Sequence, residues 1–186
     1  AILKYQLKSS NCTIIANSIF MQQTLHHRLG VHAKVHLPIV KTPKRIPLEE
    51  YDHSVKEFFT QHGRFLIVFA YEIVKGKRVV EHLRRHLPED NFIIVDRSLN
   101  SIQKFENTLF LPHLAENTGL LYYVDLVLIP SYWEEAYGRI SREATLAKVN
   151  SLVSKVGGLT ETNSEYTTFV DDYKNPEAWL KVLKDN

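Results

Sequence analysis

Short apolar runs recur along this chain at intervals that are too long for hairpins. They cover residues 12–16, 65–70, 92–95, 108–111, 126–129, 151–154 and 168–170. Most of them are almost continuously apolar and rich in β-branched or aromatic residues, as expected for strands that are covered on both faces. The runs therefore predict a buried parallel sheet, in which crossover connections join successive strands.

Segments with helical spacing lie between or after these runs. Residues 76–86 carry Val79 and Leu83 on one face and basic side chains on the other, and an apolar stripe also marks residues 137–148 and 176–183. The alternation of strand and helix predicts an α/β fold with a Rossmann-like, doubly wound parallel sheet. Ligands of such sheets bind at the carboxyl ends of the strands, where loops lead into helices.

The interval of residues 41–62 differs in composition from the rest of the chain. It contains Pro43, Pro47 and many charged residues, and an apolar pattern near residues 51–59 indicates a short helix. We interpret it as a linker that introduces the main domain at residues 63–186.

The charge balance excludes some classes of function. The 186 residues include 23 Lys and Arg against 21 Asp and Glu, a net charge of +2, which argues against a dedicated nucleic-acid binder. The single Cys12 can form neither an internal disulfide nor a zinc cluster. No apolar run approaches the ~18 residues that cross a bilayer, so we expect a soluble protein. We expect it in the cytoplasm, with the inner face of a membrane as an alternative. The chain begins with Ala1, and we expect a fragment of a longer protein, although removal of an initiator Met would leave the same first residue.

The segment of residues 126–161 is the most informative. A buried run ends at Pro130 and Ser131, an acidic aromatic loop contains Glu135, and Gly138 opens a helix. Glu143 follows eight residues after Glu135. If the helix begins near residue 137, Glu135 precedes it, Glu143 lies two turns in, and both carboxylates can face one crevice.

Two kinds of polar group meet at such a helix start. The amides of Tyr137, Gly138 and Arg139 have no partner within the helix and favour a phosphate oxygen. Carboxylates would repel that phosphate, so Glu135 and Glu143 are better suited to accept hydrogen bonds from sugar hydroxyls. A phosphate between two hydroxyl-bearing groups describes a nucleotide sugar. Glutamates are also common near helix starts for purely structural reasons, because the helix dipole favours them there.

The whole string supports the functional interpretation. The string contains Pro-Ser, an aromatic, Glu135, a second aromatic with Gly138, then Glu143-Ala144 and a later Gly-Gly-Leu-Thr-Glu at residues 157–161. This order of residues resembles the E-x7-E signature of retaining GT-B glycosyltransferases, of the group 1 or family 4 type. The similarity extends over residues 11–184, including FLIVFAYEIVKGKRVVEHL and FVDDYKNPEAWLKVL. It implies that residues 1–40 are a strand-helix-strand segment at the end of an N-terminal domain, and that residues 63–186 bind the donor.

The resemblance also implies roles for single residues. Glu143 would bind the nucleotide ribose, and Glu135 would contact the donor sugar or place it beside the leaving phosphate. The backbone of residues 136–139, including Tyr137, Gly138 and Arg139, would hold phosphate. Such enzymes are thought to react on one face of the donor, with no obligatory metal and no accepted protein nucleophile.

Two further positions follow from the same resemblance. Lys75 would neutralise charge on the departing diphosphate. The loop that contains His113 and Leu114 corresponds to a family loop near the base, although an ordinary loop histidine is the simpler interpretation. No metal or other cofactor is expected, because the spacing of the histidines near residues 26–36 matches no known metal site.

One departure from the family pattern concerns the diphosphate. The family usually has Gly-Arg a few residues before Lys-Gly, whereas this chain has Phe69-Ala70-Tyr71-Glu72. The sequence does not choose among four substitutes for the missing Arg, which are Lys77, Arg78, Arg139 and Arg142. Nucleotide binding is therefore better supported than catalysis.

The leading hypothesis is the donor-binding half of a retaining glycosyltransferase. It would transfer a hexose from a nucleoside diphosphate to a hydroxyl group of a glycan, lipid or small-molecule acceptor. A missing N-terminal domain would hold that acceptor. The chain alone would therefore bind the donor weakly and transfer nothing. An alternative is an inactive binding or scaffolding domain of the same fold, and a third is a GT-B epimerase. Peripheral association with a membrane stays open, although the basic side chains of residues 77–85 also suit a solvated helix face.

Overall fold

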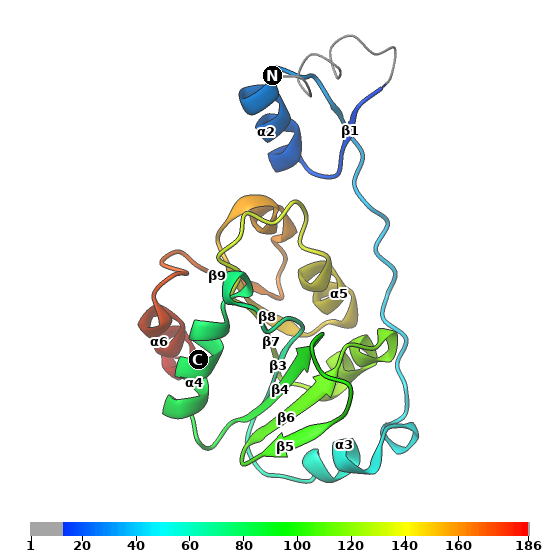
Figure 1. Cartoon of the computed structure of the whole chain (residues 1–186), viewed down its shortest axis with the longest axis vertical. Coiled ribbons are helices and arrows are strands. Elements are labelled where there is room, and N and C mark those ends of the chain that lie inside the picture. Colours follow the sequence, from blue (N-terminus) through cyan, green and yellow to red (C-terminus); the bar gives the residue numbers. More distant parts are fainter. Residues whose placement is uncertain (1–12, 186) are drawn as a thin grey trace.

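The computed structural model describes residues 13–185, so Cys12, the first residue of one predicted strand, lies outside the described residues. A small N-terminal unit lies above a sheet domain, and a long extended segment joins the two (Figure 1). The carboxyl ends of the parallel strands point toward the N-terminal unit, so any ligand at those ends lies between the two parts.

The N-terminal unit has the predicted strand-helix-strand order. It consists of β1 (Ile15–Ala16), α2 (Ile19–Leu29) and β2 (Lys34–Val35), and the two short strands pair in parallel. The hydroxyl of Ser18 caps α2 by accepting a hydrogen bond from the Met21 N–H at 3.0 Å. Gly30 ends the helix in the left-handed region, at φ 61°, which glycine adopts at little cost.

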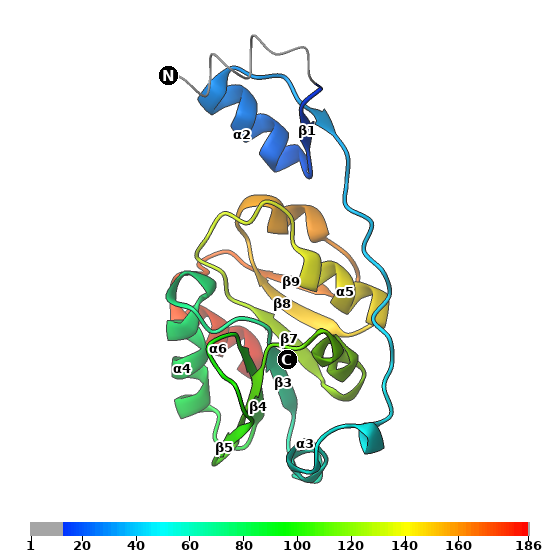
Figure 2. The same ribbon diagram turned by 45° about the vertical axis from the view of Figure 1, so that its right-hand side comes forward.

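The linker runs along one side of the domain to α3 (His53–Phe58), after the short 3-10 helix η1 (Leu48–Glu50) (Figure 2). Two tyrosines of the sheet domain hold it in place. The hydroxyl of Tyr122 donates to the Pro43 carbonyl at 2.8 Å, and that of Tyr123 donates to the Ile46 carbonyl at 2.7 Å. These tyrosines therefore hold the linker against the sheet domain.

Within residues 13–185, the central sheet has seven strands in the order β5-β6-β4-β3-β7-β8-β9. They are β3 (Phe65–Val68), β4 (Asn91–Asp96), β5 (Gln103–Phe105), β6 (Thr108–Pro112), β7 (Leu126–Ile129), β8 (Asn150–Ser154) and β9 (Thr167–Val170). All pairs are parallel except the edge pair of β5 and β6. The predicted doubly wound sheet is confirmed, with an antiparallel edge strand that the sequence did not indicate.

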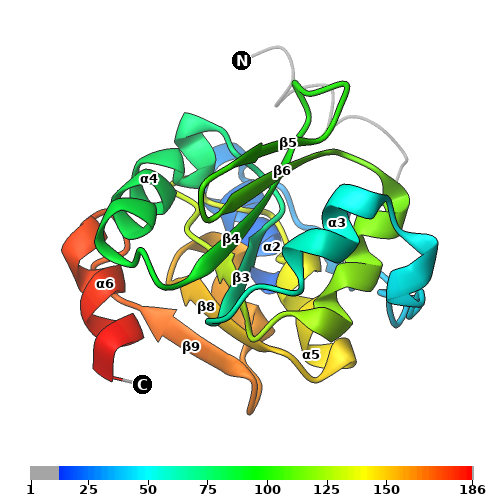
Figure 3. The same ribbon diagram turned by 90° about the horizontal axis from the view of Figure 1, so that it is seen from below.

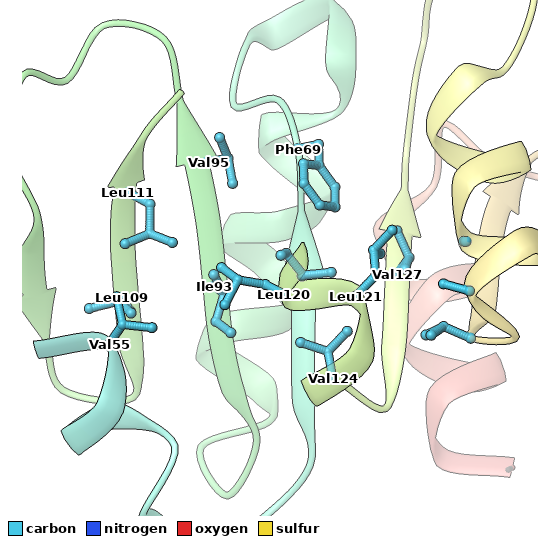
Figure 4. Close-up of a cluster of buried hydrophobic side chains, with 14 of the residues drawn as sticks. Val55, Phe69, Ile93, Val95, Leu109, Leu111, Leu120, Leu121, Val124 and Val127 are labelled. Atoms are coloured by element: carbon cyan, nitrogen blue, oxygen red, sulfur yellow. The ribbon is translucent and has the colours of Figure 1, made fainter. Parts of the chain in front are cut away.

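Helices cover both faces of this sheet (Figure 3). One face packs on α4 (Lys77–His86) and α6 (Pro176–Asp185). The other packs on α3, the 3-10 segment η3 (Ala115–Tyr123) and α5 (Arg139–Ala147). In the second layer, Leu120 and Leu121 of η3 lie against Ile93 and Val127 of the strands (Figure 4). Each fully buried side chain of this size contributes about 1.5–3 kcal/mol to the transfer free energy.

Candidate functional site

A cavity of about 400 Å³ opens at the carboxyl ends of the central strands. It lies where the strand order changes direction, because β3 connects through α4 to β4 on one side, while β7 lies on its other side. The ends of β3 and β7 and the start of α5 form most of its wall, and Asn17 and Pro38 of the N-terminal part also line it. This is the position at which open α/β sheets bind their ligands.

Two loops meet at this cavity and are joined by hydrogen bonds. The N–H groups of Tyr132 and Trp133 donate to the carbonyl of Val74 at 2.8 and 3.2 Å. Gly76, at φ 84°, lies so close to Pro130 that a Cβ would meet the Pro130 carbonyl oxygen at 1.8 Å. Only glycine fits at this close approach. The contact fixes the loop after β3, which ends in η2 (Ile73–Lys75), against the loop after β7.

Lys75 and Glu135 come from these two loops and form an ion pair inside the cavity. Their Nζ and Oε1 atoms are 2.7 Å apart, and both side chains are mostly buried, at 29% and 22% exposure. The carbonyl of Glu135 also accepts a hydrogen bond from the Gly158 N–H at 2.6 Å, in the 3-10 helix η4 (Gly157–Thr162). The sequence predicted both side chains for the site, and the structure brings them into direct contact.

The start of α5 forms the opposite wall. The helix begins at Arg139 with Gly138 as its N-cap, so the expected start near Tyr137 was two residues early. The N–H groups that lack an intrahelical partner are therefore those of Arg139, Ile140 and Ser141. Tyr137 and Gly138 line the cavity in front of them. A phosphate placed there would meet free donors and the positive end of the helix dipole.

Glu143 lies a little more than one turn into α5, not two turns as expected. It is buried, at 8% exposure, and its Oε1 is 3.5 Å from the Arg139 guanidinium. Its Oε2 is also buried and has no hydrogen-bond partner among the described residues. Burial raises the pKa of Glu143, and the Arg139 guanidinium opposes this shift.

The two glutamates do not line the same hollow. Glu143 lines a second hollow of about 370 Å³, whose other wall is the linker at residues 39–44. Arg139 lines both hollows. The expectation of one shared crevice is therefore corrected to two adjacent hollows. The physical reason is that the helix starts only at Arg139, so Glu135 stays in the preceding loop beside Lys75, whereas Glu143 on α5 lines the hollow beside the linker.

The loop after β6 carries His113 and Leu114, and both are exposed. Neither lines the two hollows next to α5. Their proposed role near the base stays a prediction. Within residues 13–185, no group of three or more His, Cys, Asp or Glu side chains is arranged to hold a metal ion.

The structure separates the four candidates for the missing Arg. Arg139 lines the cavity, whereas Lys77 lies over the ring of Tyr71 at 4.3 Å. Arg78 lines a different hollow between α4 and α6, and Arg142 donates to the Glu161 carbonyl.

The sequence alone assigned no role to two residues that the structure singles out. Arg97, which follows β4, also lines the cavity. Its position directly after a buried run is the signal that could have identified it. Glu161, the last residue of the Gly-Gly-Leu-Thr-Glu string, binds the N–H groups of Ile19 and Phe20 at 3.0 and 2.6 Å. Glu161 thus caps α2 and connects the N-terminal unit to the sheet domain.

Comparisons with known proteins give a clear result for the fold. No protein-family model and no curated protein sequence matches the chain. A glycosyltransferase from Rickettsia africae superposes with a TM-score of 0.71 at 16% identity, over 99% of this chain and 56% of its own. HepE from Anabaena, in complex with UDP-glucose, superposes with a TM-score of 0.69 at 19% identity, over 99% of this chain and 57% of its own. Sucrose-phosphate synthase from Thermosynechococcus elongatus superposes with a TM-score of 0.68 at 17% identity, over 99% of this chain and 52% of its own.

The chain therefore has the α/β fold of the C-terminal domains of GT-B glycosyltransferases, as the sequence predicted. It spans a little more than half the length of these solved chains. The E-x7-E motif and the roles of its glutamates stay predictions. Among the helices of residues 13–185, none has the length and apolar character needed to cross a membrane.

Proposed function

We propose that this chain is the donor-binding half of a retaining glycosyltransferase, which transfers a hexose from a nucleoside diphosphate sugar to a hydroxyl group. The observation that carries the proposal is the buried Oε2 of Glu143, which has no hydrogen-bond partner among the described residues. An unpaired buried carboxylate oxygen is costly, and a ligand hydroxyl would satisfy it. The helix start that suits a phosphate belongs to the same helix.

Each part of the donor then has a place in the site. The amides of Arg139, Ile140 and Ser141 hold the diphosphate together with Lys75. The hydroxyls of the ribose donate to Glu143, and the sugar lies toward Glu135. Catalysis rests on the placement of the donor and on stabilisation of the departing diphosphate.

The solved structures support this choice of ligand. Crystal structures of HepE contain UDP, UDP with glucose, or UDP-glucose. The acceptor, whether a glycan, a lipid or a small molecule, would bind to the part of a longer protein that precedes this chain, in the cytoplasm. A membrane-bound acceptor is compatible with this arrangement.

A calorimetric titration of the chain with UDP, ADP and GDP, and then with the matching nucleotide sugars, tests the proposal. We expect one nucleoside diphosphate to bind, and we expect the Glu143→Ala variant to lose most of that affinity. No binding to any of them at millimolar concentration would reject the proposal. Unchanged binding by the variant would reject the ribose role of Glu143 alone.

A second candidate is a donor-binding domain without catalysis. The stretch Phe69-Ala70-Tyr71-Glu72, which lacks the usual Gly-Arg, favours it. The two candidates differ in the fate of a bound nucleotide sugar in the longer protein with its acceptor domain. Release of the nucleoside diphosphate supports a transferase, and a donor that stays intact supports a binding domain.

A further inference from the structure

The charged side chains of the main cavity have unequal partners. Three cations line it, Lys75, Arg97 and Arg139, together with two anions, Glu72 and Glu135. Lys75 is paired with Glu135, and Arg139 is paired with Glu143. For the guanidinium of Arg97, in contrast, the structure of residues 13–185 shows neither a hydrogen bond nor an ion pair. Arg97 is thus the cavity cation whose charge no described side chain neutralises.

The backbone around Arg97 is held in a defined turn. Arg97 follows β4, and both the N–H and the hydroxyl of Ser98 donate to Oδ1 of Asp96 at 2.8 Å. This arrangement is an Asx turn, which fixes the chain directly beyond the strand. The start of the Arg97 side chain is therefore set by β4 and not by a long mobile loop.

The neighbouring strand leaves room for a long side chain. β3 and β4 pair in parallel with Val68 opposite Ile94, so the chain after β3 runs beside the chain after β4. Ala70 lies just beyond β3 and lines the same cavity as Arg97. Ala70 and Arg97 therefore line one cavity from neighbouring strand ends, and Ala70 contributes only a methyl group there.

Arg97 changes the charge balance of the side chains that line the cavity. With it, the lining side chains carry an excess of one positive charge, and without it cations and anions are equal in number. A nucleoside diphosphate brings at least two negative charges, which a cavity with equal numbers of cations and anions would not neutralise. An unpaired guanidinium is the side chain best suited to bind phosphate oxygens through two parallel hydrogen bonds.

We propose that Arg97 binds the diphosphate group of the donor and supplies the cation that is missing from the loop after β3. This inference rests on the proposed function, because it assumes a nucleoside diphosphate in the cavity. Arg97 thereby replaces, from the neighbouring strand, an arginine that would otherwise come from the loop leading to Lys75. The diphosphate would lie between Arg97, Lys75 and the start of α5.

The test compares Arg97→Gln with Arg78→Gln in the full chain. Both variants remove one positive charge, but Arg78 lines a separate hollow next to α4. The ligands are UDP, ADP and GDP and their nucleosides, titrated by calorimetry at two salt concentrations. We expect Arg97→Gln to weaken the best nucleoside diphosphate about tenfold, with the affinity for its nucleoside unchanged and a shallower salt dependence. Arg78→Gln should bind like the wild type, and Arg97→Lys should recover part of the lost affinity.

The outcomes separate this inference from the proposed function. If the wild type binds a nucleoside diphosphate and Arg97→Gln binds it equally well, Arg97 is not a ligand, while the proposed function stands. An equal loss for the nucleoside and the diphosphate would also overturn the inference, because it would indicate a general disturbance of the cavity. If the wild type binds no nucleoside diphosphate, the proposed function fails and the inference fails with it. Thermal unfolding should be the same for all variants, because Arg97 and Arg78 are both exposed.

Discussion

The two ends of the segment from Glu135 to Glu143 carry the same acidic side chain in opposite electrostatic settings. Glu135 is 2.7 Å from the Lys75 ammonium, so its charge is balanced within the protein. Glu143 is more deeply buried, its contact with Arg139 is longer at 3.5 Å, and one of its oxygens has no partner among the described residues. The first carboxylate competes with a ligand for a cation, whereas the second lacks hydrogen-bond donors that a ligand can supply.

The difference arises from the local structure around each residue. Glu135 lies in a loop that Gly158 and the hydrogen bonds of Tyr132 and Trp133 hold against the loop of Lys75. Glu143 lies inside α5, where it is buried and lines the hollow beside the linker. Under the proposed function, the same residue type therefore faces the sugar end and the ribose end of the donor in different electrostatic settings.

The largest effect is expected from Gly158→Ala, because it displaces the loop that carries Glu135 and leads into α5. A Cβ at this position would lie 2.4 Å from the carbonyl oxygen of Ala136, so the loop of Glu135 must move. We expect a loss of about 1–3 kcal/mol in the free energy of unfolding. We also expect that nucleotide binding disappears at millimolar concentration, as measured by denaturation and calorimetry.

Thr160→Ala is the control for this variant. Thr160 is exposed in the same 3-10 helix, and its replacement should leave nucleotide binding unchanged. Wild-type affinity in the Gly158→Ala variant would contradict the view that this contact positions the site.

The next largest effect is a loss of nucleotide affinity when Glu143, but not Glu135, is replaced. Glu143→Gln removes the negative charge that, under the proposed function, accepts hydrogen bonds from the ribose hydroxyls, and we expect nucleoside diphosphate affinity to fall about tenfold. Calorimetry with Glu165→Gln, which alters an exposed glutamate outside the site, provides the control. If both variants lose equal affinity, the effect is one of net charge, and the ribose contact is rejected.

A smaller effect, an increase in nucleotide affinity, is expected from the replacement of Glu135. Glu135→Gln frees Lys75 from its ion pair, so a nucleoside diphosphate without sugar should bind about threefold more tightly. Glu134→Gln is a matched control, because Glu134 is the exposed neighbour that pairs with Arg28 at 3.5 Å. Weaker binding by Glu135→Gln would contradict the competition for Lys75.

The smallest effect concerns pH. Burial raises the pKa of Glu143 above its ordinary value of 4.5, so the folded chain keeps this proton at pH values where the unfolded chain has released it. The contribution of Glu143 to the free energy of unfolding therefore falls as the pH rises above 4.5, and this fall should be absent in Glu143→Gln. Chemical denaturation of both proteins across this window measures the difference. Identical pH profiles would show that the pKa of Glu143 is not raised.

The same comparison shows what the sequence could and could not predict. The buried strands were predictable because continuous apolar runs have one simple explanation, a sheet covered on both faces. The edge strand β5 was not, because Gln103, Lys104 and Phe105 are all exposed and carry no apolar pattern. The start of α5 was placed two residues early, because Gly138 marks a helix start without showing which residue takes the first helical conformation.

Long-range contacts set the parts of the site that sequence could not reveal. Lys75 and Glu135 are 60 positions apart, and their ion pair depends on the close contact of Gly76 with Pro130. Glu161 caps α2 from 142 positions away, so no local pattern indicates it. Arg97 belongs to no sequence motif. It reaches the cavity only because β4 ends next to β3 in the folded sheet.

A crystal structure of the chain with its tightest-binding nucleoside diphosphate tests the central claim most directly, because it shows which end of the ligand faces each glutamate. We predict that the ribose hydroxyls lie within hydrogen-bond distance of Glu143. The diphosphate should lie over the amides of Arg139, Ile140 and Ser141, on the side of Lys75. A nucleotide bound in the reverse orientation, or bound away from the start of α5, would contradict the assignment of the two glutamates to the two ends of the donor.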